Sequence, residues 1–521
     1  MLLSKTTWFP ALLLAGLGAL NTLAFAPFSY HMLPLLTLSV LAYCLLQAQS
    51  PKQAAIFGYA YGLGWFGVGI SWVHVSIATF GGMPLVASLA IMLVLVGYLS
   101  VFPALATWFS WRFRGNFWFP LLVASSWFIA ENLRSWFLTG FPWLSVGYSQ
   151  TDGWMAPWAP VVGETGISFL MLLIAGSVAV AVQRKFWVWP AIAFLILAVS
   201  PGLHLLKGWQ ETGAKVKVAL VQGNIAQDLR WDPAQEAITM RKYMELSRPH
   251  LNTDIMIWPE AAIPQLEPLA LAYLFNLDML AAENNTAVVT GILDYKENGD
   301  AYNGMIVLGK SGEKATGGDY RYSTKNRYQK HHLLPIGEFV PFQSILKHVA
   351  PFFNLPMSSF SRGDWLQPNL QANGYSLLAA LCFEIAFPRQ MIANFNDDTD
   401  FLLTVSNDAW FGDSIGPHQH LEIARMRALE LGRPLLRATN NGITATVTAD
   451  GKEQARLPQF EQGVLTAEVP LVQGRTLYSS WSDWPVLIVS LFSVGLLSFR
   501  RYRWGQSLGS DPHIESSSES N

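Results

Sequence analysis

The stretch that decides the fold is Tyr375-Ser-Leu-Leu-Ala-Ala-Leu-Cys382-Phe383-Glu384-Ile-Ala-Phe-Pro388. Its nearly unbroken apolar run predicts a buried strand that leads into a corner at Cys382-Phe383-Glu384, and Pro388 then stops the ladder because proline cannot donate to it. The Cys382 thiol is thus expected at the end of the strand. The chain has 2 cysteines, and Cys44 lies in an apolar run typical of a small buried hydrophobe, so Cys382 has no expected disulfide partner. A lone cysteine on an apolar strand is more often inert than catalytic. Its chemistry therefore depends on residues elsewhere in the chain.

The composition is that of a membrane protein. Of 521 residues, 51% are hydrophobic and 13% are charged; an average soluble protein has about 25% charged residues. The stretches between Lys5 and Lys52 and between Lys52 and Arg112 contain no charged residue at all. A net charge of −2 also argues against a nucleic-acid surface, which needs clustered Lys and Arg.

The apolar stretches predict about eight transmembrane helices, because a span needs roughly 20 apolar residues. Two spans are expected between Thr6 and Pro51 and two between Gln53 and Trp111; the others are Phe117 to Asn132, Ile167 to Val182, Phe186 to Leu205 and Trp484 to Phe499. The expected organisation is a bundle of about seven helices over residues 1–210, a polar domain over 213–473, a last span within 474–504 and a disordered tail over 505–521.

Basic residues predict the orientation of these spans. With a cytoplasmic N-terminus, mainly Arg134 and Lys207 lie near the membrane on the outer side, and the other basic residues near span ends lie inside. The inner set is Lys5, Lys52, Arg112, Arg114, Arg184, Lys185, Arg500, Arg501 and Arg503. The polar domain is therefore expected on the extracytoplasmic side.

An ionisable pair lies near the end of one predicted span, in Glu131-Asn-Leu-Arg134. Charges there cost free energy unless they are paired or hydrated, and the i,i+3 spacing places both on one helix face. We expect the two side chains to contact each other. A structural ion pair and a role in handling a substrate head group both remain open.

The polar domain alternates predicted strands and helices, which indicates an α/β fold. Strands are expected over Val216 to Gln222, Asp254 to Trp258 and Thr286 to Leu293, and helices over Pro233 to Ser247 and Pro268 to Asn284. Glu260 follows one of these strands, at the strand end where open α/β sheets commonly place their sites. Lys330 lies in a polar loop, so Glu260, Lys330 and Cys382 are three complementary groups at breaks in the pattern.

These three groups can perform nucleophilic catalysis. A thiol with a pKa of about 8.5 is mostly protonated at neutral pH, so Glu260 is the candidate base and Lys330 the candidate stabiliser of thiolate and oxyanion. A backbone N–H at the corner between Cys382 and Phe383 is the other expected oxyanion donor. By spacing alone, solvated loop residues remain the commoner outcome for a glutamate and a lysine of this kind.

Several motifs resemble those of a known superfamily, and this resemblance favours a catalytic role for the three residues. Trp258-Pro259-Glu260, Lys330 followed by the stretch up to Glu338, and Cys382-Phe383-Glu384 resemble the Glu-Lys-Cys triad of the nitrilase, or carbon-nitrogen hydrolase, superfamily. Nearly the whole chain is similar to the apolipoprotein N-acyltransferase family. The further matches are Phe25 to Phe28, Thr139 to Trp143, Gly163 to Gly166, Val221 to Ile225 with Trp231, and Ser406 to Gly412.

The resemblance implies a nitrilase-like αββα sandwich in the periplasm, attached to a helical bundle in the bacterial inner membrane. It implies transfer of an acyl chain from a phospholipid, typically phosphatidylethanolamine, to the α-amine of the S-diacylglyceryl cysteine of an apolipoprotein. Glu260 is then the base, Lys330 the oxyanion stabiliser and Cys382 the nucleophile. The supporting positions are Glu338, Glu384, Trp231 and Asn303. The family commonly has tyrosine where this chain has Phe383, so only a packing role is expected there.

An apolar, proline-broken stretch after Lys330 is either a satellite core or a lid that admits acyl chains. The candidate lid residues are Phe339, Phe342, Phe352, Phe353 and Met357. No cofactor is expected, and neither is a metal, because His418 and His420 lack a further ligand cluster. We expect the protein to be a monomer and to bind no nucleic acid. Two alternatives remain: a membrane-tethered amidase acting on a small amide, and a catalytically silent lipid-binding protein.

Overall fold

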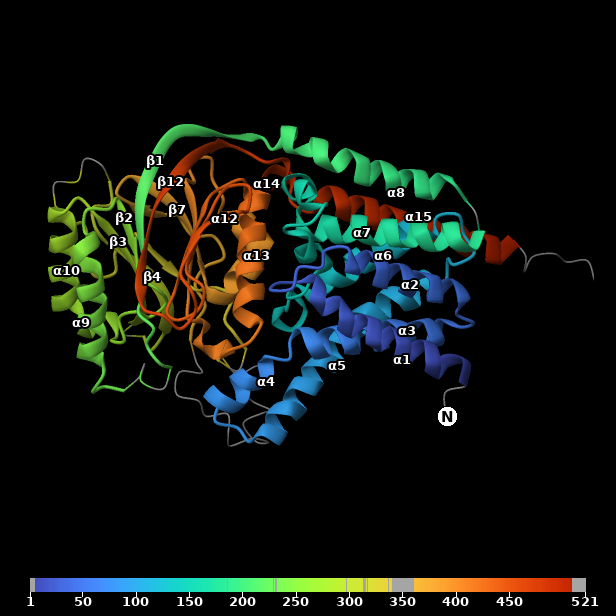
Figure 1. The fold of residues 1–521 in the computed structure, drawn as a ribbon, viewed down its shortest axis with the longest axis horizontal. Helices are drawn as coiled ribbons and strands as arrows, with labels where there is room; N and C mark the ends of the chain where they lie inside the picture. Colours follow the sequence, from blue (N-terminus) through green and yellow to red (C-terminus); the bar gives the residue numbers. More distant parts are fainter. Residues whose placement is uncertain are drawn as a thin grey trace, which may run out of the picture.

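The computed structural model describes residues 5–507 except 185, 228, 230, 231, 297, 313, 314, 316, 336 and 340–359. It consists of a helical bundle and an α/β sandwich packed end to end (Figure 1). Several residues named in the sequence predictions lie outside the described residues. They are the candidate lid residues Phe342, Phe352, Phe353 and Met357, the supporting candidate Trp231, and residues 508–521 of the predicted tail.

The bundle has a helix at each predicted span. Its helices are α1 (Lys5–Asn21), α2 (Leu33–Gln47), α3 (Pro51–Gly69), α5 (Leu85–Trp111), α6 (Phe119–Arg134), α7 (Ala159–Arg184), α8 (Val188–Val199) and α15 (Trp484–Ser507). By length and apolar composition, 4 helical segments of the described chain could cross a membrane, or 5 if α3 and the bent segment after it form one span. Helix α2 and the segment Trp484–Arg500 of α15 are apolar but shorter, so the expected eight crossings are only partly supported.

The chain bends after α3, well before α5 begins. After α3 ends at Gly69, the short α4 (Val73–Val75) and the π-helical turn η2 (Ser76–Phe80) continue at an angle of 56°. Figure 1 shows α4 near the lower edge of the sandwich, next to the lower end of α5. This bend brings residues of the helical bundle to the surface of the α/β domain.

The α/β domain is a four-layer sandwich. One sheet has the order β12-β1-β2-β3-β4-β5 and the other β11-β10-β9-β8-β7-β6. The first sheet contains β1 (Trp209–Gln222), β2 (Ile255–Ile257), β3 (Ala287–Tyr295), β4 (Ala301–Gly309), β5 (Arg327–Gln329) and β12 (Gly463–Gly474). The second contains β6 (Leu370–Ala372), β7 (Tyr375–Leu381), β8 (Phe401–Ser406), β9 (Leu435–Thr439), β10 (Ala445–Val447) and β11 (Glu453–Arg456).

Helices cover both outer faces of this sandwich. Helices α9 (Glu236–Ser247) and α10 (Leu271–Glu283) lie on the first sheet, and α12 (Pro388–Asn394) and α13 (Gly416–Leu431) lie between the second sheet and the bundle (Figure 1). The predicted strands and helices of this region are confirmed with shifts of a few residues at their ends. The main difference is β1, which begins at Trp209 because it pairs with β12 along a long antiparallel ladder. The start of β1 and the end of β12 both lie on the side of the bundle (Figure 1).

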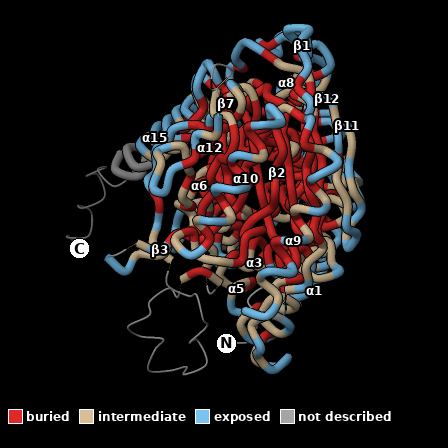
Figure 2. Tube along the Cα trace, turned by 90° about the vertical axis from the view of Figure 1, so that its left-hand side faces the viewer, coloured by how far each residue is buried: buried red, intermediate tan, exposed pale blue. Residues whose placement is uncertain are grey.

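The hydrophobic core continues from the bundle into the sandwich. One buried cluster joins bundle residues such as Trp65 and Trp127 to Phe383 and to α13 residues such as Leu421, whereas a separate cluster fills the space between the sheets. Figure 2 shows the buried trace running through the middle of the molecule, with exposed segments at its rim. Burial on this scale fixes the domain on the bundle, because each buried aromatic side chain contributes about 1.5–3 kcal/mol.

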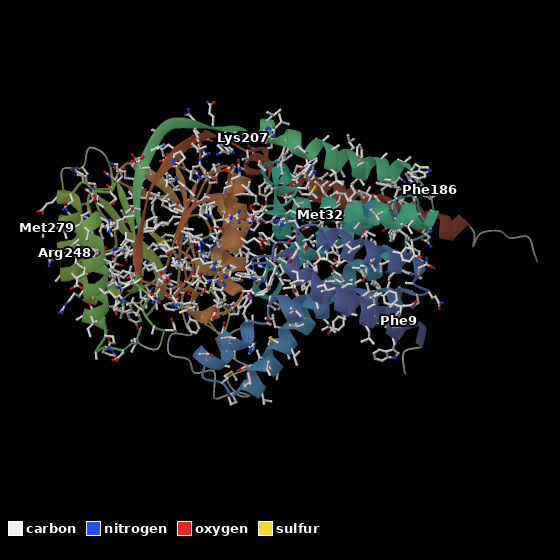
Figure 3. All side chains as sticks on the ribbon, in the orientation of Figure 1. Phe9, Met32, Phe186, Lys207, Arg248 and Met279 are labelled. Atoms are coloured by element: carbon white, nitrogen blue, oxygen red, sulfur yellow. The ribbon has the colours of Figure 1, made fainter. Side chains whose placement is uncertain are left out.

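Basic residues gather at the end of the bundle that is remote from the sandwich. Arg184 donates to the carbonyl oxygens of Arg114 and Gly115 at 2.6 and 3.0 Å. Figure 3 places Phe9 and Phe186 toward this end and Arg248 and Met279 at the opposite end of the molecule, on the sandwich. The basic end and the α/β domain thus lie on opposite sides of the apolar helices.

Candidate active site

The three predicted catalytic residues stand just beyond strand ends in both sheets. Glu260 follows β2, Lys330 follows β5 directly, and Cys382 follows β7. Lys330 is 2% exposed and Glu260 is 9% exposed. Cys382 lies close enough for the charges of both to act on its thiol. The structure therefore brings the predicted triad together across the sandwich.

Two supporting residues predicted from the sequence hold the charged pair. The Nζ of Lys330 lies 4.0 Å from Oε1 of Glu260 and 2.8 Å from Oε2 of Glu338. Asn303 donates from Nδ2 to Oε1 of both carboxylates at 2.8 Å. The backbone N–H of Asn407, which the sequence analysis missed as a site residue, donates to Oε2 of Glu260 at 2.9 Å. Both oxygens of Glu260 are thus held in place.

The electrostatics keep Lys330 charged and Cys382 neutral. Burial lowers the pKa of Lys330, but Glu338 and Glu260 outweigh it and the net pKa is raised. Burial, with a further contribution from Glu260, raises the pKa of Cys382 to about 12, although Lys330 acts to lower it. The expected thiolate stabilisation by Lys330 therefore exists but is outweighed. Nucleophilic attack by Cys382 would therefore require a base to take the thiol proton.

Glu384 fastens the nucleophile loop to the lysine loop. Its carboxylate accepts from the backbone N–H of Leu381 at 2.9 Å and from those of His331 and His332 at 2.7 and 2.9 Å. The hydroxyl of Tyr328 also donates to it at 2.8 Å. Burial raises the pKa of Glu384. Glu384 thus joins the segment next to Cys382 to the segment next to Lys330.

Cys382 has a left-handed backbone conformation with φ 53°. Such a φ costs about 1–3 kcal/mol for a non-glycine residue and persists only where surrounding contacts enforce it. Here Nε2 of His420 lies 3.1 Å from the Cys382 carbonyl oxygen, and Nδ1 of His420 lies 3.0 Å from Oδ1 of Asp408. Arg437 donates to the other oxygen of Asp408 at 2.7 Å. His420 therefore supports the backbone at Cys382, a contact that its sequence neighbourhood did not indicate.

The second histidine of the pair considered for metal binding has a separate environment. Nε2 of His418 lies 3.0 Å from Nε2 of Gln459, whereas His420 lies against Asp408 and Cys382. The two rings come from one helix, α13, but contact different parts of the domain. Each has a hydrogen-bonding role in the structure.

Phe383 has the packing role expected for its ring. It stacks on Trp143 with ring centroids 6.3 Å apart and an interplanar angle of 19°, and it meets Phe387 edge to face at 5.1 Å. For the candidate lid residue Phe339, the observed contact is with Arg362, whose guanidinium carbon lies 5.4 Å from the centroid of the Phe339 ring.

A cavity of about 260 Å³ opens beside the thiol. Its lining is mainly apolar and comes from both parts of the chain: Ile77 lies in η2, Ile91 and Leu95 in α5, and Cys382 and Phe383 in the sandwich. A site for a small polar amide would need more polar groups than this lining offers. Cys382 thus faces apolar space that extends toward the helices of the bundle.

The expected contact between Glu131 and Arg134 is wrong. Glu131 accepts from the Ser145 hydroxyl at 3.0 Å and from the Val146 N–H at 3.2 Å. Arg134 donates to the carbonyl oxygens of Phe141 and Trp143 at 2.8 and 2.6 Å. Both charged side chains form hydrogen bonds with the loop that follows their helix, because the polar groups of a buried loop need partners. They hold Trp143 in the cavity wall.

Comparison with known proteins covers nearly the whole chain. The family model for the apolipoprotein N-acyltransferase N-terminal domain matches residues 17–177, and the carbon-nitrogen hydrolase model matches residues 217–478. The chain is 50% identical over 94% of its length to an apolipoprotein N-acyltransferase of Vibrio vulnificus, of which it covers 96%. It is 48% identical to that of Vibrio cholerae, over 94% of this chain and 97% of the relative.

A third relative, the apolipoprotein N-acyltransferase of Photobacterium profundum, is 47% identical over 93% of this chain and 94% of its own. The two family models also divide the chain where the structure changes from helical bundle to α/β sandwich. The chain belongs to the apolipoprotein N-acyltransferase family.

Proposed function

We propose that this enzyme transfers an acyl chain from a membrane phospholipid to the α-amine of an S-diacylglyceryl cysteine at the N-terminus of an apolipoprotein, through a thioester on Cys382. The observation that carries the proposal is the apolar cavity that joins the thiol to α5 of the bundle. Such a cavity suits a long acyl chain, and a transferase must hold that chain between its two half-reactions.

The first half-reaction acylates Cys382. Glu260 accepts the thiol proton while sulfur attacks the ester carbonyl, and the raised thiol pKa makes these steps simultaneous. The Lys330 ammonium, together with the backbone N–H of Phe383, stabilises the oxyanion. When the tetrahedral intermediate collapses, the ester C–O bond breaks and the lysophospholipid oxygen takes the proton from Glu260.

The second half-reaction passes the acyl group to the amine. The neutral α-amine adds to the thioester carbonyl, and Lys330 again faces the oxyanion. Glu260 accepts a proton from the attacking nitrogen and returns it to sulfur as the C–S bond breaks. The products are an amide and the resting thiol, so the enzyme is ready for another cycle.

The proposed setting is the bacterial inner membrane with the sandwich in the periplasm. The basic end of the bundle then lies in the cytoplasm, as the distribution of Lys and Arg predicts. The proposed donor is phosphatidylethanolamine, and the proposed working unit is the monomer. The helices proposed to cross the membrane are α1, α2, α3, α5, α6, α7, α8 and α15.

A mass measurement on protein incubated with phospholipid vesicles tests this function. An acyl adduct on the peptide that contains Cys382, removed by a diacylglyceryl peptide with a free amine, is the expected result. An adduct that water removes as fast as the amine does would indicate the amidase alternative. Bound lipid without any adduct would indicate a silent lipid-binding protein.

A further inference from the structure

One glutamine of the α/β domain links the sandwich to two tryptophans of the bundle. Oε1 of Gln419, on α13, accepts from Nε1 of Trp72 at 3.1 Å and from Nε1 of Trp143 at 2.8 Å. Its Nε2 donates to the Gly69 carbonyl oxygen at 3.1 Å, at the end of α3. Because both indoles can only donate, they fix which end of the amide is oxygen.

This arrangement is buried throughout. Gln419 and Trp143 are each 1% exposed and Trp72 is 8% exposed. Replacing the amide with an apolar group would leave two buried indole N–H groups without their acceptor, which burial makes costly. The single side chain of Gln419 thus determines how two large rings sit.

The two rings form the cavity wall next to the nucleophile. Trp72 and Trp143 lie with centroids 5.4 Å apart, and Trp143 stacks on Phe383 while Trp72 meets Phe411 at 4.6 Å. All four rings line the cavity that contains Cys382. The wall beside the thiol is therefore built in part by the membrane segment and held by the catalytic domain.

A thioester at Cys382 has two competing fates. Attack by the lipoprotein amine gives the amide, whereas attack by water forms a C–O bond, breaks the C–S bond, returns a proton to sulfur and releases a free fatty acid. Since both routes can use Glu260 as base, the triad alone does not select the amine. Selection requires that water be kept from the thioester until the amine arrives.

We propose that Gln419 is a positioning residue that holds the Trp72 and Trp143 indoles as a water-excluding wall, so that the Cys382 thioester reacts with an amine rather than with water. The inference rests on the proposed function. It assigns transferase selectivity to a contact outside the triad, between α13 and the ends of the membrane segments.

The test measures the lifetime of the acylated enzyme without acceptor. Full-length Gln419→Met enzyme keeps the approximate side-chain shape but loses the amide. After acylation from phosphatidylethanolamine vesicles and removal of donor, we expect its thioester to release free fatty acid at least tenfold faster than the parent thioester. Trp143→Phe keeps a ring but loses one N–H donor, so a smaller acceleration is expected.

Arg425→Met is the matched control, because Arg425 lies on the same helix and pairs with Asp152 of the bundle away from the cavity. Its thioester should persist for as long as the parent thioester. A second readout is the alkylation of Cys382 by iodoacetamide in resting enzyme, resolved by peptide mass, which should be faster in Gln419→Met than in parent or control.

The possible results separate the two proposals. If the parent forms a thioester and neither Gln419→Met nor Trp143→Phe shortens its lifetime, the wall proposal is overturned and the proposed function stands. Equal shortening in Arg425→Met would also overturn it, since loosened domain contact would then explain the effect. If Gln419→Met does not fold, the Trp143→Phe lifetime decides. Absence of any thioester in the parent would overturn the proposed function itself.

Discussion

Nδ2 of Asn303 donates to Oε1 of Glu260 at 2.8 Å, and this contact fixes one of the two oxygens of the proposed base. The same amide nitrogen also binds Glu338, which holds Lys330. Base and cation are therefore coupled through one side chain on β4. We expect Asn303→Leu to lower the rate of thioester formation about tenfold to a hundredfold through misplacement of Glu260, as measured by mass on lipid-treated enzyme.

The matching change Asn298→Leu removes an exposed amide whose partner is Asp300 and should leave the rate unchanged. Thermal unfolding of both variants serves as the folding check. An unchanged acylation rate in folded Asn303→Leu would contradict a positioning role.

Replacing the nucleophile should stop the reaction. Cys382→Ser presents an alcohol whose pKa is far above that of the thiol, so the same base cannot activate it. We expect transfer to fall by at least about a thousandfold, assayed as amide formation on a diacylglyceryl peptide. Cys44→Ser, which changes a cysteine in α2, should retain activity. Undiminished transfer by Cys382→Ser would exclude the thioester route.

Lys330→Met should remove the stabilisation of the oxyanion. By analogy with a lost oxyanion donor, we expect acylation to slow by about a hundredfold or more, which corresponds to roughly 3 kcal/mol. Lys452→Met, on an exposed turn, is the control. The rate constant for thioester formation is the measurement, and a parental rate in Lys330→Met would show that the ammonium has another role.

The pH dependence of alkylation tests the state of the thiol. With the pKa of Cys382 at about 12, the thiolate fraction should rise by about tenfold per pH unit throughout the neutral to alkaline range, without a plateau near pH 9. The rate of iodoacetamide labelling of Cys382, followed by peptide mass, measures this fraction. A plateau at or below pH 9 would indicate a preformed thiolate and contradict coupled proton transfer.

Glu260→Gln should change the two reactions of the thiol in opposite directions. The negative charge of Glu260 helps to raise the pKa of Cys382, so its removal lowers that pKa and speeds alkylation at a fixed pH. Acylation by phospholipid should nevertheless be nearly abolished, because the base is lost. If both reactions slow in a folded variant, Glu260 acts through structure rather than as a base.

The sequence predicted the two-part organisation, since long uncharged stretches can only be buried in lipid or protein. The strand that ends at Cys382 and the motifs around Glu260 and Lys330 pointed to the triad, and the motif around Glu338 and Glu384 pointed to its support. The apolar run of β7 marked the strand before Cys382, but the roles of Glu260, Lys330 and their supports came from the resemblance of these motifs to the nitrilase superfamily, since spacing alone favoured solvated loop residues.

Other features depended on the tertiary structure. Glu131 and Arg134 have the spacing of an ion pair, but the buried loop after their helix offers backbone partners that no helical pattern encodes. In the sequence, His420 is one of two neighbouring histidines considered for metal binding. The packing of α13 instead places its ring against the Cys382 carbonyl oxygen.

By itself, then, the sequence determined the class of fold and the family, and it predicted which residues react. The tertiary structure alone decided that the thiol stays protonated and that Gln419 joins the catalytic domain to Trp72 and Trp143. The physical reason is range: hydropathy and strand periodicity are local, whereas a pKa or a buried hydrogen bond depends on which residues, hundreds of positions apart, come within a few ångströms.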